Sequence, residues 1–159
     1  MKTPILLLLL IVSGFSCKKS TDNAVVIDIN VDIQLVDDQD KNLIDQVPSV
    51  DFNDLKIYYV VNGKKDLFYN GNYGYPKGYG ILESLNGDKY LRLFPNTQGE
   101  MPVTLIQFNE TDIDTIKCEF YKKKSNIICT KVWYNNVLKW DVADKNSSET
   151  REMTIVKDL

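Results

Sequence analysis

The chain has 159 residues and a formal net charge of −3, and 43% of its residues are hydrophobic. This size and composition fit one domain with a sizeable core, and the mild acidity without a basic stripe argues against nucleic acid as a partner. The chain has no histidine, which excludes Ser-His-Asp and Cys-His catalysis and histidine-based metal sites. Nucleotide-binding fingerprints such as GxGxxG are also absent, so we expect no cofactor, no metal and no enzymatic activity.

Residues 1–16 are predicted to be a secretory signal peptide. Lys2 forms a short basic region, and an apolar run over 5–12 follows that is too short to span a bilayer. Cys17 comes directly after the small residue Ser16, and this arrangement resembles the lipobox of bacterial lipoproteins. The resemblance implies cleavage before Cys17 and lipidation of that cysteine. The alternative is an ordinary signal peptide that is cut nearby and leaves an exported protein without a lipid.

The resemblance also implies where the protein lies. Several acyl chains on Cys17 would exceed what stable membrane anchoring requires. Residues 17–23 are polar and would form a tether between the membrane and a single domain over 24–159. Lys18 stands where inner-membrane lipoproteins commonly have Asp, so we expect a lipid-anchored protein of the outer membrane, on its periplasmic face.

The remaining chain shows the patterns of β-strands. Residues 25–35 have aliphatic side chains at every odd position, which predicts a half-buried strand. Asn62-Gly63 lies between two apolar runs and is the strongest short-range signal for a β-hairpin. No segment has the apolar spacing of a helix. We expect nine or so strands. They come from ten candidate segments, residues 25–35, 55–61, 64–69, 80–85, 88–94, 101–108, 114–121, 126–134, 137–140 and 151–157. The predicted fold is all-β, an antiparallel β-sandwich of immunoglobulin-like or transthyretin-like kind.

Two cysteines flank one of the predicted turns. Cys118 and Cys129 lie symmetrically about the turn over 122–126, so a simple hairpin register would place them directly opposite each other. In an oxidising compartment this register predicts a disulfide, which would contribute about 2 to 3 kcal/mol for a loop of this length. The alternative is a pair of free, half-buried thiols, because direct cross-strand geometry is often poor for a disulfide.

Several segments together resemble the small lipoproteins of the Bacteroidetes phylum. The resemblance implies an all-β lipoprotein and supplies no active site, so Cys17 is the only functional residue that it transfers. It is carried by residues 15–19 (FSCKK), 54–65 (DLKIYYVVNGKK), 75–81 (YPKGYGI) and 114–135, which contains DTIKCEFY and ICTKVWYN.

One short motif resembles a modification site of that phylum. Asp114-Thr115-Ile116 is similar to the D-[S/T]-aliphatic acceptor for protein O-glycosylation. The resemblance implies a glycan on Thr115. The alternative is that these three residues simply begin a β-strand.

Residues 68–80 (FYNGNYGYPKGYG) contain an unusual density of aromatic residues and glycines. Tyrosine in a surface loop offers a rigid face with a polar tip, which suits stacking on sugar rings or packing in a protein interface. We expect one of Phe68 and Tyr69 to point into the core, and Tyr73, Tyr75 and Tyr79 to be the candidate ligand-binding residues. The alternative is that these rings cap the open end of the sandwich.

These observations lead to one functional hypothesis and one rival. The leading hypothesis is a non-enzymatic, lipid-anchored protein of the cell envelope that binds a glycan or a protein partner through the tyrosine-rich loop. The rival is a structural or assembly subunit of an envelope complex or adhesin. That rival predicts an exposed apolar edge or patch around Trp133 and Trp140.

Overall fold

The computed structural model describes residues 25–44, 51–148 and 150–159, and nearly all of its regular structure is β-strand. The elements are β1 (Ile27–Asp28), β2 (Val31–Val36), the 3₁₀ helix η1 (Phe52–Asp54), β3 (Lys56–Val61), β4 (Lys64–Leu67), β5 (Tyr79–Glu83), β6 (Lys89–Leu93), β7 (Val103–Gln107), β8 (Ile113–Lys123), β9 (Asn126–Tyr134), β10 (Val137–Asp141) and β11 (Glu152–Val156).

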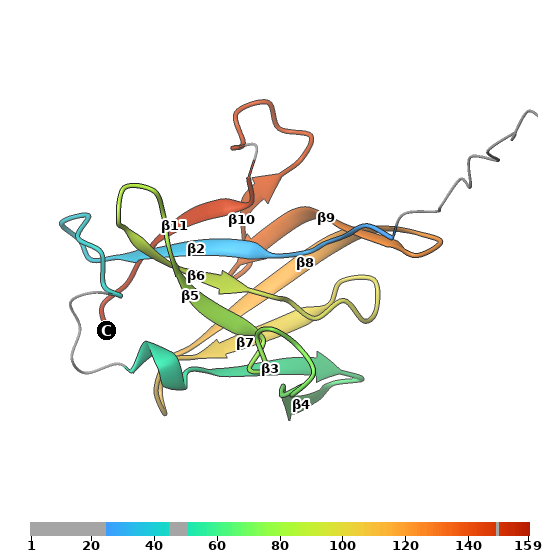
Figure 1. The fold of residues 1–159 in the computed structure, drawn as a ribbon, viewed down its shortest axis with the longest axis horizontal. Coiled ribbons are helices and arrows are strands. Elements are labelled where there is room, and N and C mark those ends of the chain that lie inside the picture. Colours follow the sequence, from blue (N-terminus) through green and yellow to red (C-terminus); the bar gives the residue numbers. More distant parts are fainter. Residues whose placement is uncertain (1–24, 45–50, 149) are drawn as a thin grey trace, which may run out of the picture.

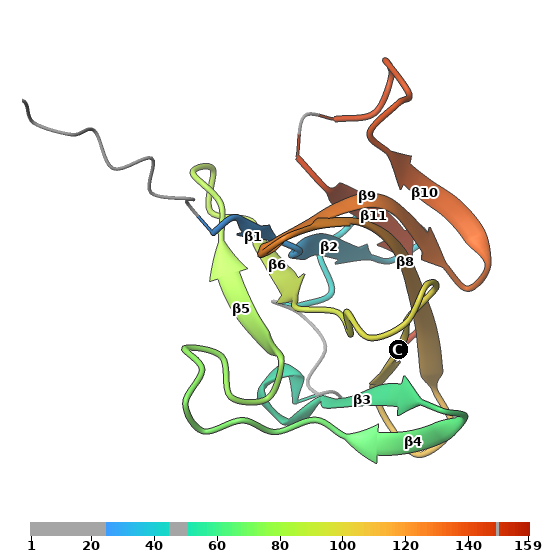
Figure 2. The same cartoon turned by 90° about the vertical axis from the view of Figure 1, so that its right-hand side faces the viewer.

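The strands form two sheets that pack face to face (Figures 1 and 2). The seven-stranded sheet has the order β1-β9-β8-β7-β3-β4, and β10 also pairs with β9. The four-stranded sheet has the order β11-β2-β6-β5. The loop between β4 and β5 runs from an edge strand of one sheet to an edge strand of the other (Figure 2). This loop is the tyrosine-rich segment of the sequence.

The core lies between the two sheets and is mainly aliphatic. Each sheet contributes side chains that are completely buried: Ile33, Leu35, Leu91 and Leu93 from the smaller sheet, and Ile106, Ile116 and Val132 from the larger one. Alternation along the strands produces this arrangement, because every second side chain of a strand points to the same face. The predicted all-β sandwich is confirmed, while its immunoglobulin-like or transthyretin-like kind stays a prediction.

The strand pairing differs from the prediction in two places. β1 pairs with β9, and β11 pairs with β2, in parallel rather than antiparallel orientation. The predicted strand over 25–35 is also divided, since β1 belongs to the larger sheet and β2 to the smaller one. The alternation of the sequence continues across this break, but Ile27 is 63% exposed whereas Val31 is buried.

The predicted register of the cysteine hairpin is wrong. Cys118 lies opposite Val132, and Cys129 lies opposite Phe120, because the register shifts between Glu119 and Phe120. Both cysteines are free and buried. The neighbouring Cys129 thiol and burial raise the pKa of Cys118, so this thiol stays protonated at neutral pH.

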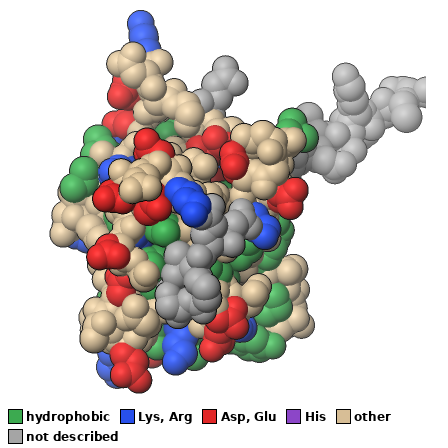
Figure 3. Space-filling model, turned by 90° about the vertical axis from the view of Figure 1, so that its left-hand side faces the viewer, with side chains coloured by type: hydrophobic (Ala, Val, Ile, Leu, Met, Phe, Trp, Pro, Cys, Tyr) green, Lys and Arg blue, Asp and Glu red, His purple; other side chains and the backbone are tan. Residues whose placement is uncertain are grey.

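The outer surface carries mixed charges. On the face that Figure 3 shows, acidic and basic side chains are interspersed.

Within the described part of the chain, no helix is long and apolar enough to cross a membrane.

A buried ionic cluster attaches the last strand to the larger sheet. Asp114 is 5% exposed as a residue, and its carboxylate accepts hydrogen bonds from the Tyr134 hydroxyl, from Asn135 Nδ2 at 2.7 Å and from Lys157 Nζ. Lys157 also donates to Asp112 Oδ1 at 2.8 Å. Burial alone would raise the pKa of Asp114, but the hydrogen bonds from Lys157, Tyr134 and Asn135 outweigh burial and lower it.

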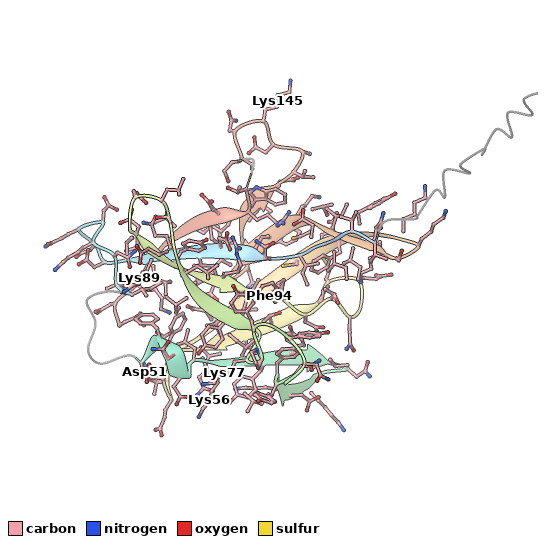
Figure 4. All side chains as sticks on the ribbon, viewed as in Figure 1. Asp51, Lys56, Lys77, Lys89, Phe94 and Lys145 are labelled. Atoms are coloured by element: carbon pink, nitrogen blue, oxygen red, sulfur yellow. The ribbon has the colours of Figure 1, made fainter. Side chains whose placement is uncertain are left out.

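The cluster leads to the first prediction. Lys157→Met should lower the free energy of unfolding by about 3 to 5 kcal/mol at neutral pH, because the buried Asp114 carboxylate loses its cation. Urea unfolding followed by circular dichroism measures this change. The exposed residue Lys145 (Figure 4) provides the control, since Lys145→Gln should change stability by no more than about 0.5 kcal/mol.

The sign of the pH dependence follows from the lowered pKa of Asp114. A carboxyl whose pKa is lower in the folded state stabilises the fold above its unfolded pKa, about 3.9, and this stabilisation disappears as the pH falls through the folded pKa. The difference between wild type and Lys157→Met should therefore shrink in acid. Equal stability of the two proteins at neutral pH would contradict the role given to the cluster.

Candidate functional site

An aromatic groove lies beside the tyrosine-rich loop. It is a cavity of about 670 Å³ whose walls come from residues 27–30 around β1, from β3, from the β4–β5 loop and from the segment after β6. We use the name aromatic groove for this cavity and its lining. Its aromatic residues are Tyr59, Phe68, Tyr73, Tyr75 and Phe94.

One group of rings is built on β3. The ring of Tyr59 packs against Phe68 with 4.3 Å between the centroids, and Phe68 contacts Tyr73 with 6.2 Å between the centroids. The Tyr59 hydroxyl donates a hydrogen bond to the carbonyl oxygen of Phe94 at 2.7 Å. Burial raises the pKa of Tyr59, so this phenol remains a neutral donor and joins β3 to the end of β6.

A second group of rings lies next to β5. Tyr75 stacks on Phe94 with 5.0 Å between the centroids and 25° between the planes. The Tyr75 ring occupies the space above Gly80, where a β-carbon would overlap it. In the same way, a β-carbon on Gly78 would lie 2.8 Å from Cδ1 of Phe68. The two glycines therefore leave room for the two rings, and Gly78 also has the φ of +80° that disfavours other residues.

Backbone hydrogen bonds fix the shape of the loop. The Asn70 amide donates to the Pro76 carbonyl at 2.8 Å, and the Gly78 amide donates to the Tyr75 carbonyl at 3.0 Å. Lys77 Nζ donates to the Asn53 carbonyl oxygen at 2.9 Å, which attaches the loop to η1 (Figure 4). These contacts fix the backbone of the loop before any ligand arrives, which reduces the entropy cost of binding.

Neutral polar side chains line the groove between the rings. Asn96 is 1% exposed and has a structural role, since its Nδ2 donates to the Val60 carbonyl at 3.2 Å and its Oδ1 accepts from the Gln98 amide at 3.0 Å. Four further polar side chains make no hydrogen bond to any part of the chain that the structure describes: Asn30, Asn72, Thr97 and Gln98. Their amide and hydroxyl groups are available to a ligand.

The structure brings together two of the three predicted ligand-binding tyrosines. Tyr73 and Tyr75 line the aromatic groove, and the Tyr73 side chain is 58% exposed. Tyr79 does not line it, because it lies on β5 with its side chain toward the core and is only 7% exposed. The expectation for the preceding pair is met, since Phe68 packs against the core while Tyr69 is 70% exposed.

The remaining predicted residues lie away from the groove or outside the described chain. Thr115 is half-buried on β8, where its amide donates to Asn135 Oδ1 at 2.7 Å. Cys17 lies outside the described residues. Trp133 is half-buried on β9, but Trp140 is 5% exposed and cannot form part of an exposed patch.

Sequence reasoning missed the side of the groove that is distant in the chain. The sequence patterns place Tyr59 only within a strand, and they place Phe94 at a strand end and the polar residues over 96–98 in a loop. A partial signal was present, because Phe94, Pro95 and Asn96 combine an aromatic residue with turn-forming residues. Nothing local in the sequence places them against Tyr75.

The groove can bind by stacking and by hydrogen bonds. Aromatic faces pack against the C–H faces of a flat ring, while amide and hydroxyl groups exchange hydrogen bonds with polar substituents. Among residues 25–44, 51–148 and 150–159, no group of three or more histidine, cysteine, aspartate or glutamate side chains could hold a metal ion.

The contact between the Tyr75 ring and Gly80 leads to the second prediction. Gly80→Ala should lower the free energy of unfolding by about 1 to 3 kcal/mol, because the new methyl group overlaps the Tyr75 ring. In a Tyr75→Ala background the same substitution should have a much smaller effect, and a double-mutant cycle by urea unfolding measures the difference. Gly74→Ala is the control, since a β-carbon there meets nothing within 4 Å. An equal cost of Gly80→Ala in both backgrounds would contradict the contact.

Comparisons with known proteins found no relative from which a function could be transferred. No family model matches the chain, and no significant match was found among curated proteins or among solved structures. The function therefore has to be argued from the geometry and chemistry of the groove.

Proposed function

We propose that the protein is a non-enzymatic, lipid-anchored component of the cell envelope that binds a glycan in the aromatic groove. The observation that carries this proposal is the combination of five aromatic rings with four neutral polar side chains that lack hydrogen-bond partners in the described chain. A sugar ring presents an apolar C–H face and a periphery of hydroxyl groups. The groove offers a matching partner for each of these two surfaces.

The rigidity of the groove supports the same proposal. Tyr75 is held between Phe94 and the backbone of β5, and Phe68 is held by Tyr59 and Gly78. Sugars in water gain little from each hydroxyl contact, since each contact replaces a hydrogen bond to water. A preformed site avoids the additional cost of ordering a loop.

The location remains part of the proposal. Residues 1–16 act as a lipoprotein signal peptide, Cys17 carries the lipid, and residues 17–23 connect it to the domain. The resemblance of FSCKK to a lipobox supports this arrangement, as does Lys18 for the outer membrane. A glycan on Thr115 is proposed on the same basis. Anchoring would place the groove close to the envelope polysaccharides that it binds.

A second candidate function is supported by the outer face of the larger sheet. Four apolar side chains lie in register across β10, β9, β7 and β3, with Lys117 of β8 between them: Leu138, Trp133, Val103 and Val60. Such a row could pack against another subunit, as expected of an assembly component of an envelope complex or adhesin. Leu138 is 49% exposed.

The third prediction tests glycan binding. Tyr73→Ala should weaken retention of the purified domain on immobilised polysaccharides by about tenfold or more, because it removes an exposed ring of the groove. The free energy of unfolding should change by less than about 1 kcal/mol. Tyr121→Ala is the matched control, since that tyrosine is 49% exposed on β8 and does not line the groove. The proposal is wrong if no polysaccharide in a broad array retains the wild type, or if the two variants behave alike.

The fourth prediction separates the two candidate functions. Trp133→Ser should leave polysaccharide retention unchanged if the aromatic groove carries the function. If the outer row carries it, the same substitution should prevent assembly of the complex extracted from native membranes, measured by light scattering after size-exclusion chromatography. Loss of assembly together with unaltered binding by Tyr73→Ala would favour the second candidate.

A further inference from the structure

We infer that the aromatic groove selects uncharged glycans and discriminates against sugars that carry carboxylate or sulfate groups. This inference rests on the proposed function and specifies its ligand class. It follows from the charge of the groove and of its surroundings, which are independent of the aromatic rings.

The groups available to a ligand are all neutral. The polar side chains that lack partners in the described chain are three amides and one hydroxyl, namely Asn30, Asn72, Gln98 and Thr97. No charged side chain of the described residues lines the groove. An amide exchanges hydrogen bonds with a sugar hydroxyl in both directions, as donor and as acceptor. An anionic group would instead require a cation or several converging donors.

Two cations that bond to the backbone of groove-lining residues are already engaged. Lys122 Nζ donates to the carbonyl oxygens of Thr97 at 2.7 Å and of Gly99 at 2.8 Å. Arg151 is bound by both oxygens of Asp28 and donates to the Asn30 carbonyl at 2.7 Å, and its side chain is only 11% exposed. Both side chains hold carbonyl groups of residues that line the groove, Thr97 and Asn30, so a ligand that recruited either cation would have to replace those hydrogen bonds.

A second arginine near Tyr75 is committed in the same way. Arg92 donates to both carboxylate oxygens of Asp32, from Nε at 2.8 Å and from Nη2 at 2.6 Å. The hydrogen bonds to Asp32 raise the pKa of Arg92, so the guanidinium remains charged and paired. The charge of Arg92 is therefore balanced by Asp32 within the protein.

The carboxylate closest in sequence to the groove is already paired with Arg151. Asp28 lies between Ile27 and Ile29, which both line the groove, but Asp28 does not line it. An anionic sugar would therefore lose its hydration against a neutral lining without gaining a cation of that lining. A neutral hydroxyl at the same place does not meet this penalty.

The test compares each retained neutral polysaccharide with its own carboxymethylated derivative, so that chain and linkages stay the same. The wild-type domain should bind the derivative about tenfold more weakly or worse. Binding of the neutral polysaccharide should be nearly independent of salt, because no net charge is neutralised on binding. Affinity electrophoresis in gels that contain either polymer measures both quantities.

A matched pair of variants tests the cause of the selectivity. Gln98 is exposed at the rim of the groove, and Gln98→Lys adds a cation there. This variant should bind the carboxymethylated polymer up to about fivefold more tightly than wild type, with the gain lost at high salt. Gln98→Ala should not show this gain.

The outcomes distinguish the inference from the function on which it rests. If the derivative binds as well as the neutral polymer, and Tyr73→Ala abolishes both, glycan binding stands and the selectivity is wrong. The same conclusion follows if only acidic polysaccharides of the array are retained. If nothing in the array is retained by the wild type, the proposed function fails and the inference fails with it.

Discussion

The absence of a side chain at Gly78 and Gly80 is the constraint on which the aromatic groove depends. Phe68 and Tyr75 occupy the space that β-carbons would take at these positions. This space allows the Tyr75 ring to stack on Phe94 and the Phe68 ring to pack on Tyr59. The loop that carries both rings also joins the edge of one sheet to the edge of the other (Figure 2).

The parts of the fold that sequence could predict are those determined by local chemistry. Asn62 and Gly63 both have positive φ, as the two-residue hairpin between β3 and β4 requires, and Asn135 and Asn136 do the same between β9 and β10. The parallel pairs could not be predicted from local patterns. β11 and β2 are separated by more than a hundred residues, and no turn connects them directly. The register shift after Glu119 was missed for a related reason, since a bulge inserts one residue without a distinct signal.

The candidate site likewise has a part that local sequence could predict and a part that it could not. Tyr73 and Tyr75 could be identified from the density of rings and glycines in one stretch. Tyr79 was misassigned, because its place in β5 depends on where the strand begins, and a shift of one residue moves a side chain to the other face. Phe94 and the neutral residues that follow it come from another part of the chain. Only the paired sheets bring them to the tyrosines, so composition could suggest binding but could not define the ligand class.

The central claim is that a glycan lies in the aromatic groove, and chemical-shift mapping by NMR tests it most directly. A ¹⁵N-labelled domain would be titrated with a neutral oligosaccharide cut from a polysaccharide that retains it. The account predicts the largest shifts at the loop amides over 72–75 and at the segment over 96–98, which form two walls of the groove. Shifts confined to the outer face of the larger sheet around Trp133, with both walls unchanged, would contradict it.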